Sequence, residues 1–312
     1  MTSTSSVTAP LVSVVMTAYN REDYIKEAID SVLAQSFADF ELIVVDDCST
    51  DRTRDVVQGY LHDRRVRLIC NDRNLGDYPN RNHASTFARG EFLKFHDSDD
   101  LMYPHCLEIM VAALRAHPSA AFALSGDGGW PGGPSPMLLT PRMCYQREFL
   151  GSGGVFRPGP AGALFRTAAF AELGRFPLSG THSDALFWIA ACARRPVVLA
   201  QGDLLYYRVH AGQELQKSGA AYELARFEGV LFRALNAPEC PLDTLEREQA
   251  KRNLAAGVIK RSFRDLRTGQ PGLAVFRLKH SGLSLGEWLR YSRRPRRQTA
   301  AGTPRPLAKE HG

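Results

Sequence analysis

Short apolar runs alternate with amphipathic stretches through residues 10–127, and this alternation limits the fold of the chain more than any other feature. The apolar runs are rich in β-branched residues and predict strands at residues 10–20, 40–47, 65–70, 91–100 and 121–127. The intervening stretches have apolar residues at helical spacing and predict helices at residues 21–36, 49–61, 80–90 and 104–117. Such an alternation implies βαβ crossovers. We therefore expect an α/β fold with a parallel sheet covered by helices on both faces.

The composition indicates the class of protein. Apolar residues make up 44% of the chain and charged residues 23%, which is typical of a globular protein. The six cysteines form no C-x-x-C pair, which argues against a disulfide framework or a zinc ribbon and favours a reducing compartment. The N-terminal segment lacks the basic and apolar regions of a signal peptide, and no apolar run reaches the roughly 18 residues of a membrane-spanning helix. We therefore expect a cytoplasmic protein with a disordered leader at residues 1–9.

Two of the predicted strands end in clusters of acids. Asp46 and Asp47 end the second strand, and Asp97, Asp99 and Asp100 end the fourth. Ligands of open α/β sheets bind outside the carboxyl ends of the strands, so we expect these carboxylates to meet across one crevice. Carboxylates this crowded must share protons, pair with basic groups or coordinate a cation.

The Asp97-Ser98-Asp99 segment suits a divalent cation. Alternate residues of an extended chain point the same way, and Mg²⁺ or Mn²⁺ takes one or two carboxylates together with waters and substrate phosphate oxygens. From these letters alone, an acidic turn that caps the next helix is an open alternative.

Several motifs occurring together are more specific than any one of them. The segments "VSVVMTAYNREDYIKEAIDSVLAQSFADFELIVVDDCSTDRT" and "NLGDYPNRNHASTFARGEFLKFHDSDD", in this order and spacing, resemble the family 2 glycosyltransferases with the GT-A fold. The resemblance covers residues 10 to 215 or so. It implies a bacterial, inverting, hexosyltransferase-type enzyme (EC 2.4) that uses a nucleotide sugar, with UDP-sugars favoured, and Mn²⁺ or Mg²⁺. The implied fold is a Rossmann-like, mostly parallel sheet with helices on both faces, here followed by a C-terminal helical extension.

The resemblance also assigns residues of the nucleotide-sugar site. Thr17 and Tyr19 match positions that line the base pocket, where Tyr19 stacks on the base, and Asp47 matches the acid that accepts a hydrogen bond from it. Asn82 falls in the same nucleotide-sugar-binding set. Tyr19 as a buried ring and Asp47 as a helix cap are the alternatives.

The acids that end the fourth strand match the metal and ribose positions of the family. By resemblance, Asp97 faces the ribose and the metal, and Asp99 ligates the metal that bridges the diphosphate. Asp100 is open between this site and a cap for the next helix.

Asp184 matches the catalytic base, which would deprotonate an acceptor hydroxyl. It lies where a helix begins, and a helix N-terminus stabilises an ionised acid. The family usually has a second acid just before this position, whereas this chain has His182 and Ser183. A plain helix cap is the alternative role.

The remaining candidates lie in loops. In "GDLLYYRVHAGQELQKS", which resembles the end of the catalytic domain, Arg208 is expected to bind the nucleotide-sugar phosphate. His210 is expected to bind the metal, with contact to the diphosphate as the alternative. Residues 125–136 and 151–162 are rich in Gly and Pro and predict flexible loops over the site. Trp130 in the first loop either stacks on a sugar or anchors the loop.

The sequence suggests four parts. These are the leader at 1–9, a catalytic domain at 10–219 with nucleotide-binding (10–125) and acceptor-binding (126–219) halves, a helical extension at 220–285 and a basic, flexible tail at 286–312. Arginines beside Trp288, Leu289 and Tyr291 in the tail suit an anionic membrane surface at the inner face of the cell membrane, and a solvated tail is the alternative.

The predicted activity is transfer of a sugar to a hydroxyl of a glycan or lipid-linked acceptor in cell-surface polysaccharide biosynthesis. The alternatives are a non-catalytic sugar-nucleotide-binding protein and another nucleotide-sugar enzyme such as a nucleotidyltransferase. "TAYNRED" stands where a nucleotidyltransferase would have its Gly-rich phosphate loop, which argues against that enzyme. An acidic cleft disfavours nucleic acid as a partner. The sequence is also compatible with a homodimer.

Overall fold

The computed structural model describes residues 9–126, 134–151, 154–179, 182–210 and 220–292. The elements up to residue 124 are β1 (Val12–Ala18), α1 (Ile25–Leu33), β2 (Phe40–Asp46), α2 (Thr53–Gln58), β3 (Val66–Cys70), α3 (Asp77–Ser85), β4 (Phe92–Asp97), β5 (Leu101–Met102), α4 (Cys106–Ala116) and β6 (Phe122–Leu124). The next are β7 (Met137–Leu139), α5 (Pro141–Leu150), a 3-10 turn (Pro160–Gly162), β8 (Ala163–Arg166), α6 (Thr167–Glu172), α7 (Ser183–Arg194), β9 (Val197–Leu199) and β10 (Leu205–Tyr206). The last are α9 (Ala220–Asn236), α10 (Thr244–Arg267), α11 (Pro271–His280) and α12 (Leu285–Ser292). All five predicted strands and all four predicted helices of the first part are present.

One eight-stranded sheet organises the molecule, in the order β3-β2-β1-β4-β8-β6-β9-β7. β1 pairs in parallel with β2 and β4, and β2 pairs in parallel with β3, as the alternation predicts. β8 is antiparallel to both β4 and β6, so the sheet is mixed, and the prediction of a mostly parallel sheet with helices on both faces is confirmed. The direction of β8 depends on the route of the Gly- and Pro-rich chain before it, which has no pattern that reveals a direction.

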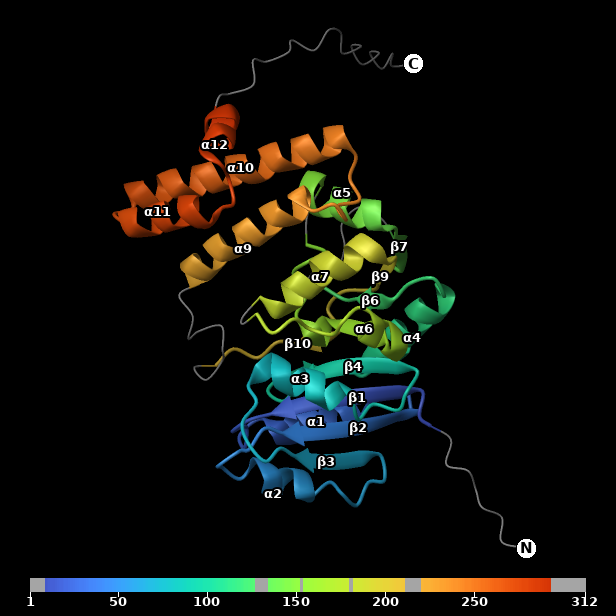
Figure 1. The fold of residues 1–312 in the computed structure, drawn as a ribbon. Helices are drawn as coiled ribbons and strands as arrows, with labels where there is room; N and C mark the ends of the chain where they lie inside the picture. Colours follow the sequence, from blue (N-terminus) through green and yellow to red (C-terminus); the bar gives the residue numbers. More distant parts are fainter. Residues whose placement is uncertain (1–8, 127–133, 152–153, 180–181, 211–219, 293–312) are drawn as a thin grey trace, which may run out of the picture.

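The two faces of the sheet have separate apolar cores. Alternate residues of β1 point to opposite faces, so Val14 and Met16 join one core and Val15 joins the other. The first core includes apolar residues of α1, α2 and α4, and the second includes those of α3, α5, α6 and α7. Figure 1 shows the strands stacked from β3 at the bottom to β7 near the top, with α10, α11 and α12 above and α9 beneath α10.

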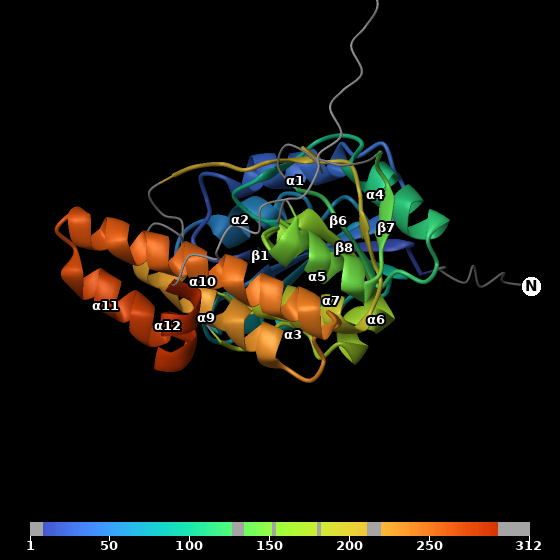
Figure 2. The same cartoon turned by 90° about the horizontal axis from the view of Figure 1, so that it is seen from above.

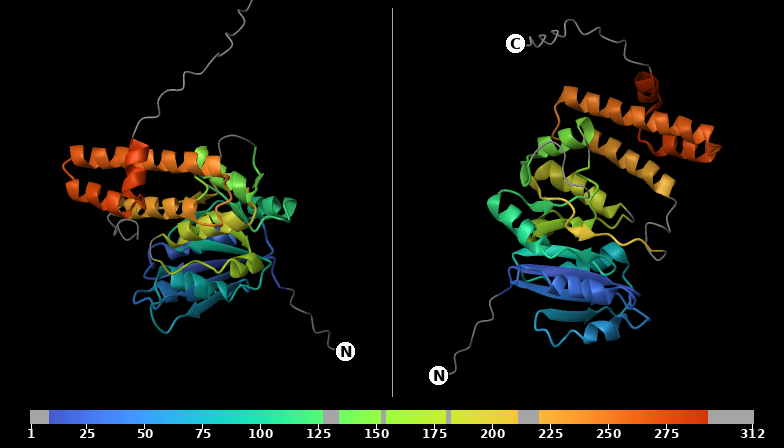
Figure 3. Two further views of the ribbon diagram at one scale, coloured as in Figure 1. Left: turned by 45° about the horizontal axis from the view of Figure 1, so that its top comes forward. Right: turned by 180° about the vertical axis from the view of Figure 1, so that it is seen from behind.

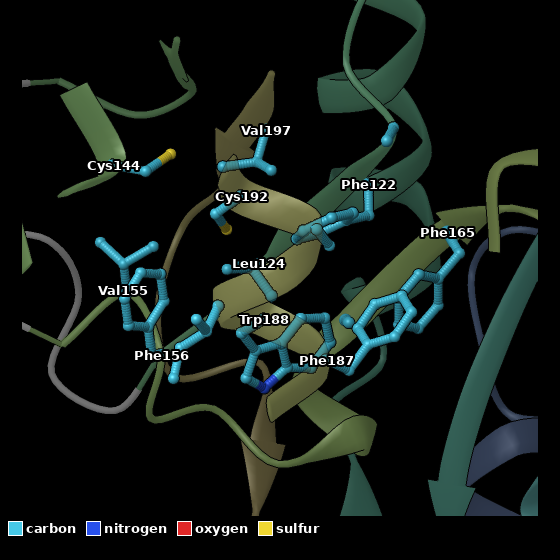
Figure 4. Packing of buried hydrophobic residues seen from close by; sticks show 14 of the residues in the cluster. Phe122, Leu124, Cys144, Val155, Phe156, Phe165, Phe187, Trp188, Cys192 and Val197 are labelled. Atoms are coloured by element: carbon cyan, nitrogen blue, oxygen red, sulfur yellow. The ribbon is translucent and has the colours of Figure 1, made fainter. Parts of the chain in front are cut away.

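An aromatic cluster fixes α7 on the second core (Figure 4). The Trp188 ring is fully buried and stacks on Phe165 of β8, with ring centroids 5.6 Å apart. Its indole N–H donates to the Pro158 carbonyl over 2.7 Å. These contacts hold the first turn of α7, which contains Asp184, at a fixed place beside the sheet.

The C-terminal helices pack on one another and on α5. Arg142 of α5 pairs with Asp243 (2.6 Å) and Glu246 (2.9 Å), which together form the capping box of α10. The segment predicted to be a flexible tail from residue 286 begins as a helix instead, because α12 runs to Ser292 and Arg290 pairs with Glu248 of α10 over 3.2 Å. Residues 293–312 and the predicted leader up to residue 8 lie outside the described part.

Within the described residues, no helix combines the length and the apolar character that crossing a membrane requires.

Candidate functional site

The strand register brings the acid clusters to one edge of the sheet. Thr17 of β1 stands opposite Val45 of β2 on one side and opposite Asp97 of β4 on the other. Ala18 stands opposite Asp46. The loops that follow β1, β2 and β4 therefore begin side by side, as the sequence predicts.

Asp47 is buried and its carboxylate organises the loop before α3. It accepts hydrogen bonds from the Asn71 amide (2.7 Å) and from the backbone N–H groups of Leu75 and Gly76 (both 2.9 Å). The alternative role as a cap of α2 is excluded, because Asp51 accepts from Thr53 at the start of that helix. A carboxylate has about four acceptor positions, so a base N–H remains within its capacity.

Asp97 is paired with a buried arginine that the sequence reading missed. Arg81 of α3 reaches Asp97 with Nη2 (2.8 Å) and Asp77 with Nε (2.7 Å). Burial raises the pKa of the Asp97 carboxyl, but the Arg81 guanidinium outweighs burial and the net pKa lies below its usual value. Asp97 is therefore held as a carboxylate.

Asp99 and His210 meet although they are far apart in the sequence. The Asp99 Oδ2 atom lies 3.1 Å from His210 Nε2 and 3.0 Å from Arg21 Nε. Asp99 and His210 are the two residues predicted to bind the metal. The Asp99 side chain is 14% exposed and that of His210 is 11% exposed, so a small ligand can still reach both.

Tyr24, which the sequence reading also missed, holds the segment that carries His210. Its ring stacks on the imidazole of His210 with centroids 4.4 Å apart, and the Arg208 guanidinium lies 5.3 Å from the same ring. Arg208 also pairs with Glu27 of α1 over 2.8 Å. The start of α1 thus fixes both predicted residues of this segment.

Asp100 lies deeper than its neighbours. It is buried, and its Oδ1 atom accepts a hydrogen bond from the backbone N–H of Arg208 over 3.0 Å. Burial, with the negative charge of Asp97 next, raises the pKa of Asp100 to about 7. The start of α4 is capped by Gln35, which accepts from Leu107, so Asp100 fastens the 208–210 segment rather than that helix.

Asp184 lies in the first turn of α7. Its carboxylate accepts a hydrogen bond from the Ala185 backbone N–H (2.7 Å) and another from the Tyr78 side chain. Burial raises the pKa of Asp184 above its usual value, and the two hydrogen bonds offset this only in part. Burial thus opposes the stabilisation of the ionised form that a helix N-terminus is expected to give.

Asp184 and the donor-side acids share one positive neighbour. Arg81, which pairs with Asp97, also lowers the pKa of Asp184. The helix N-cap residue is His182, which makes no side-chain cap hydrogen bond and instead contacts Glu223 of α9 over 3.1 Å. The first turn of α7 is therefore joined to both α3 and α9.

The other residues predicted to bind the nucleotide sugar, Thr17, Tyr19 and Asn82, differ in their exposure and contacts. The Tyr19 ring is 45% exposed, which excludes the buried-ring alternative, and Thr17 is half-buried beside it. The Asn82 amide donates to the Phe176 carbonyl (2.7 Å) and accepts from its N–H (3.1 Å), so in this conformation it joins α3 to the segment after α6. Its role toward a nucleotide sugar stays a prediction. Trp130 lies outside the described residues.

The chemistry of the site fits a divalent cation with two protein ligands. A carboxylate oxygen and an imidazole nitrogen converge at Asp99 and His210, and Mn²⁺ or Mg²⁺ commonly completes such a set with waters and phosphate oxygens. In the part of the chain that is described, no cluster of three or more His, Cys, Asp or Glu side chains is arranged to hold a metal ion. A bound cation would compete with Arg21 for Asp99 Oδ2.

Among curated proteins, the chain is 42% identical over 118 residues to a "Putative teichuronic acid biosynthesis glycosyltransferase TuaG" of Bacillus subtilis, covering 38% of this chain and 46% of that protein. It is 40% identical over 104 residues to a "UDP-Glc:alpha-D-GlcNAc-diphosphoundecaprenol beta-1,3-glucosyltransferase WfgD" of Escherichia coli, covering 33% and 41%. Each match spans less than half the length of the relative.

Solved structures extend the likeness over most of the chain. S. aureus TarS in complex with UDP-GlcNAc superposes with a TM-score of 0.59 at 25% identity, over 90% of this chain and 79% of that one. The mannosyltransferase PcManGT from Pyrobaculum calidifontis, in complex with GDP-Man and Mn²⁺, has a TM-score of 0.55 at 17% identity, over 88% of both chains, and shares the fold.

The family model of glycosyl transferase family 2 matches residues 13–174, just over half of the chain, and this range includes all of β1 except Val12, together with β2, β4 and the acids that follow them. The predictions of family and of a GT-A-like fold with C-terminal helices are confirmed. This chain belongs to glycosyl transferase family 2.

Proposed function

We propose that this protein transfers a sugar from a nucleoside-diphosphate sugar, with UDP-sugars favoured, to a hydroxyl of a glycan or lipid-linked acceptor. The observation that carries the proposal is the approach of His210 to Asp99, over 111 residues of sequence, at the edge of the sheet where β1, β2 and β4 end. A carboxylate and an imidazole so placed form a binding site for a cation and the phosphates that it would bridge.

The donor half of the site would be built by β1, β2 and β4. Tyr19, which follows β1, offers an exposed ring to a nucleobase, and Asp47, which follows the neighbouring strand β2, offers acceptor atoms. Asp97, kept ionised by Arg81, is suited to accept hydrogen bonds from ribose hydroxyls. Arg208 is suited to the negative charge of a diphosphate.

Asp184 would act as the general base. A carboxyl whose pKa lies above its usual value is a stronger base toward an acceptor hydroxyl than an exposed aspartate is. The Tyr78 hydroxyl and the Ala185 N–H fix its orientation. Direct displacement with one base inverts the anomeric centre, so we propose an inverting reaction.

Bound at Asp99 and His210, Mn²⁺ or Mg²⁺ would neutralise charge on the departing nucleoside diphosphate. The protein residues do the rest of the work in this proposal. Arg208 and the acids hold the donor, and α7 holds the base. This fixed geometry lowers the entropic part of the activation barrier, because the two reactants are already held together.

The proposed setting is cell-surface polysaccharide biosynthesis in the cytoplasm. The names of TuaG and WfgD, one concerned with teichuronic acid and the other with a diphosphoundecaprenol-linked sugar, support a cell-surface glycan and a lipid-linked acceptor. We further propose that residues 10–219 form the catalytic domain and that the extension begins with α9.

Calorimetric titration of UDP, dTDP and GDP, each with Mn²⁺ and with a chelator, tests the donor site. We expect one nucleotide to bind in a metal-dependent way, and the Asp99→Asn variant to lose at least about tenfold in affinity. The matched control is Asp39→Asn, which removes the same charge from an exposed position just before β2, at the opposite edge of the sheet. If no nucleotide binds to the folded protein, the proposal is wrong.

A further inference from the structure

The outer surface of α10 has an unusual combination of side chains near its C-terminal end. Lys260, Phe263, Arg264 and Arg267 recur at helical spacing and therefore share one helix face, with Leu266 at its border. Phe263 is 56% exposed, Leu266 49%, and the Arg264 side chain 66%. We call these five residues the α10 face.

Among the described residues, Arg264 of the α10 face has one ion pair, with Asp265, and Lys260 and Arg267 have none. Asp265 is the only acidic residue in the sequence between positions 249 and 286. Its side chain is 5% exposed and points inward to Arg277 (3.0 Å), and it approaches Arg264 only to 3.9 Å.

The chemistry of this face selects among occupants. A second copy docked face to face would bring like charges together, which disfavours a dimer here. A nucleic acid would satisfy the cations but not the exposed Phe263 and Leu266. An anionic phospholipid surface satisfies both, because cations meet the headgroups while aromatic and aliphatic side chains enter the interfacial layer.

The position of the hairpin suits such a contact. α10 and α11 project beyond the rest of the molecule in Figures 1 and 2. In Figure 1 the turn between α10 and α11 points to the left, and β1 also runs toward the left. The turn and the loop after β1 therefore lie on the same side of the molecule. The two further views in Figure 3 show the same projection.

We propose that the α10 face docks the protein on an anionic phospholipid surface. The inference extends the proposed function, because a lipid-linked acceptor would then lie in the same membrane. The contact itself involves none of the donor-site residues. It differs from the contact predicted for the basic tail, since Arg290 and Tyr291 of that segment are engaged with Glu248.

Co-sedimentation of the full chain with vesicles tests the proposal without any substrate. Vesicles of phosphatidylcholine mixed with phosphatidylglycerol are compared with vesicles of phosphatidylcholine alone. We expect binding to the anionic vesicles only, weakened by salt. The triple variant Lys260→Ser, Arg264→Ser, Arg267→Ser should lose at least about tenfold in partitioning, and Phe263→Ser with Leu266→Ser should lose binding at constant charge.

The matched control is Arg64→Ser, Arg115→Ser, Arg194→Ser, which removes the same charge from exposed positions elsewhere. This control should keep its vesicle binding, and nucleotide titration checks that every variant keeps its donor site. Absence of binding to anionic vesicles, or equal losses in the two triple variants, would overturn the proposal. The proposal would also be overturned if the α10-face variants lost dimer formation or binding of duplex DNA while keeping their binding to anionic vesicles.

Discussion

At the scale of single residues, the site depends on contacts between side chains that the sequence keeps far apart. The motif around Asp97 and Asp99 and the resemblance around His210 predict that Asp99 and His210 bind a metal, and their side chains lie 3.1 Å apart. Arg81 was not predictable, because an arginine inside a helix has no distinguishing pattern and only the fold shows that it is buried between Asp77 and Asp97.

Tyr24 provides the first residue-scale prediction. Its ring stacks on His210 and should hold that imidazole in place against Asp99. Tyr24→Ala should weaken metal-dependent nucleotide binding by about two- to tenfold, the worth of one aromatic contact, whereas Tyr24→Phe should bind as the wild type does. Calorimetry measures both variants. Equal affinities for all three proteins would show that the stacking positions nothing.

The second residue-scale prediction concerns the pH dependence set by Asp184. The base must be ionised to act, so the rate should rise with pH through the raised pKa of Asp184. The Tyr78 hydroxyl lowers that pKa, and Tyr78→Phe should therefore move the acidic limb of the kcat profile to higher pH. The readout is nucleoside diphosphate released from the donor with water as acceptor.

Tyr145→Phe is the control for Tyr78→Phe, because it removes a buried hydroxyl that bonds to the Ile189 carbonyl, away from Asp184. Its acidic limb should coincide with that of the wild type. An unmoved limb in Tyr78→Phe, or the same movement in both variants, would contradict the assignment of Asp184.

At the scale of elements, the strands and helices up to residue 124 follow from their apolar spacing, because each buries a face of matching period. β5 and β10 were not predictable, since each is two residues long and exists through pairing with the other across about a hundred residues of sequence. The direction of β8 likewise depends on the sheet that surrounds it.

The aromatic anchor of α7 gives the prediction at this scale. Trp188→Ala should lower the free energy of unfolding by about 3–5 kcal/mol, because a fully buried indole leaves a cavity. Phe263→Ala, at an exposed position, should change it by less than about 0.5 kcal/mol. Urea unfolding compares the two. A similar small loss in both would show that the Trp188 cluster does not anchor α7.

At the scale of the whole molecule, buried charge ties the C-terminal helices together. Arg277 of α11 is 1% exposed and pairs with Glu228 of α9 (2.8 Å) and Asp265 of α10 (3.0 Å). The sequence predicts these helices from their spacing, but it does not reveal that one arginine joins three of them, because partners from separate helices share no local pattern.

Removal of Arg277 should therefore destabilise the extension. Arg277→Met leaves two buried carboxylates without this partner and should lower the free energy of unfolding by about 3–5 kcal/mol. Lys279→Met, two residues away and exposed, should change it little. Equal stability of the two variants in urea would contradict the structural role of Arg277.

The central claim is that Asp99 and His210 act as one site for a divalent cation and a nucleoside diphosphate. The most direct test is a double-mutant cycle, with calorimetric binding of the nucleotide in Mn²⁺ for the wild type, Asp99→Asn, His210→Gln and the double variant. The account predicts that each single variant loses most of the metal-dependent affinity and that the double variant loses little more, with a coupling energy of about 1 kcal/mol or greater. Strictly additive losses, or undiminished affinity in either single variant, would contradict it.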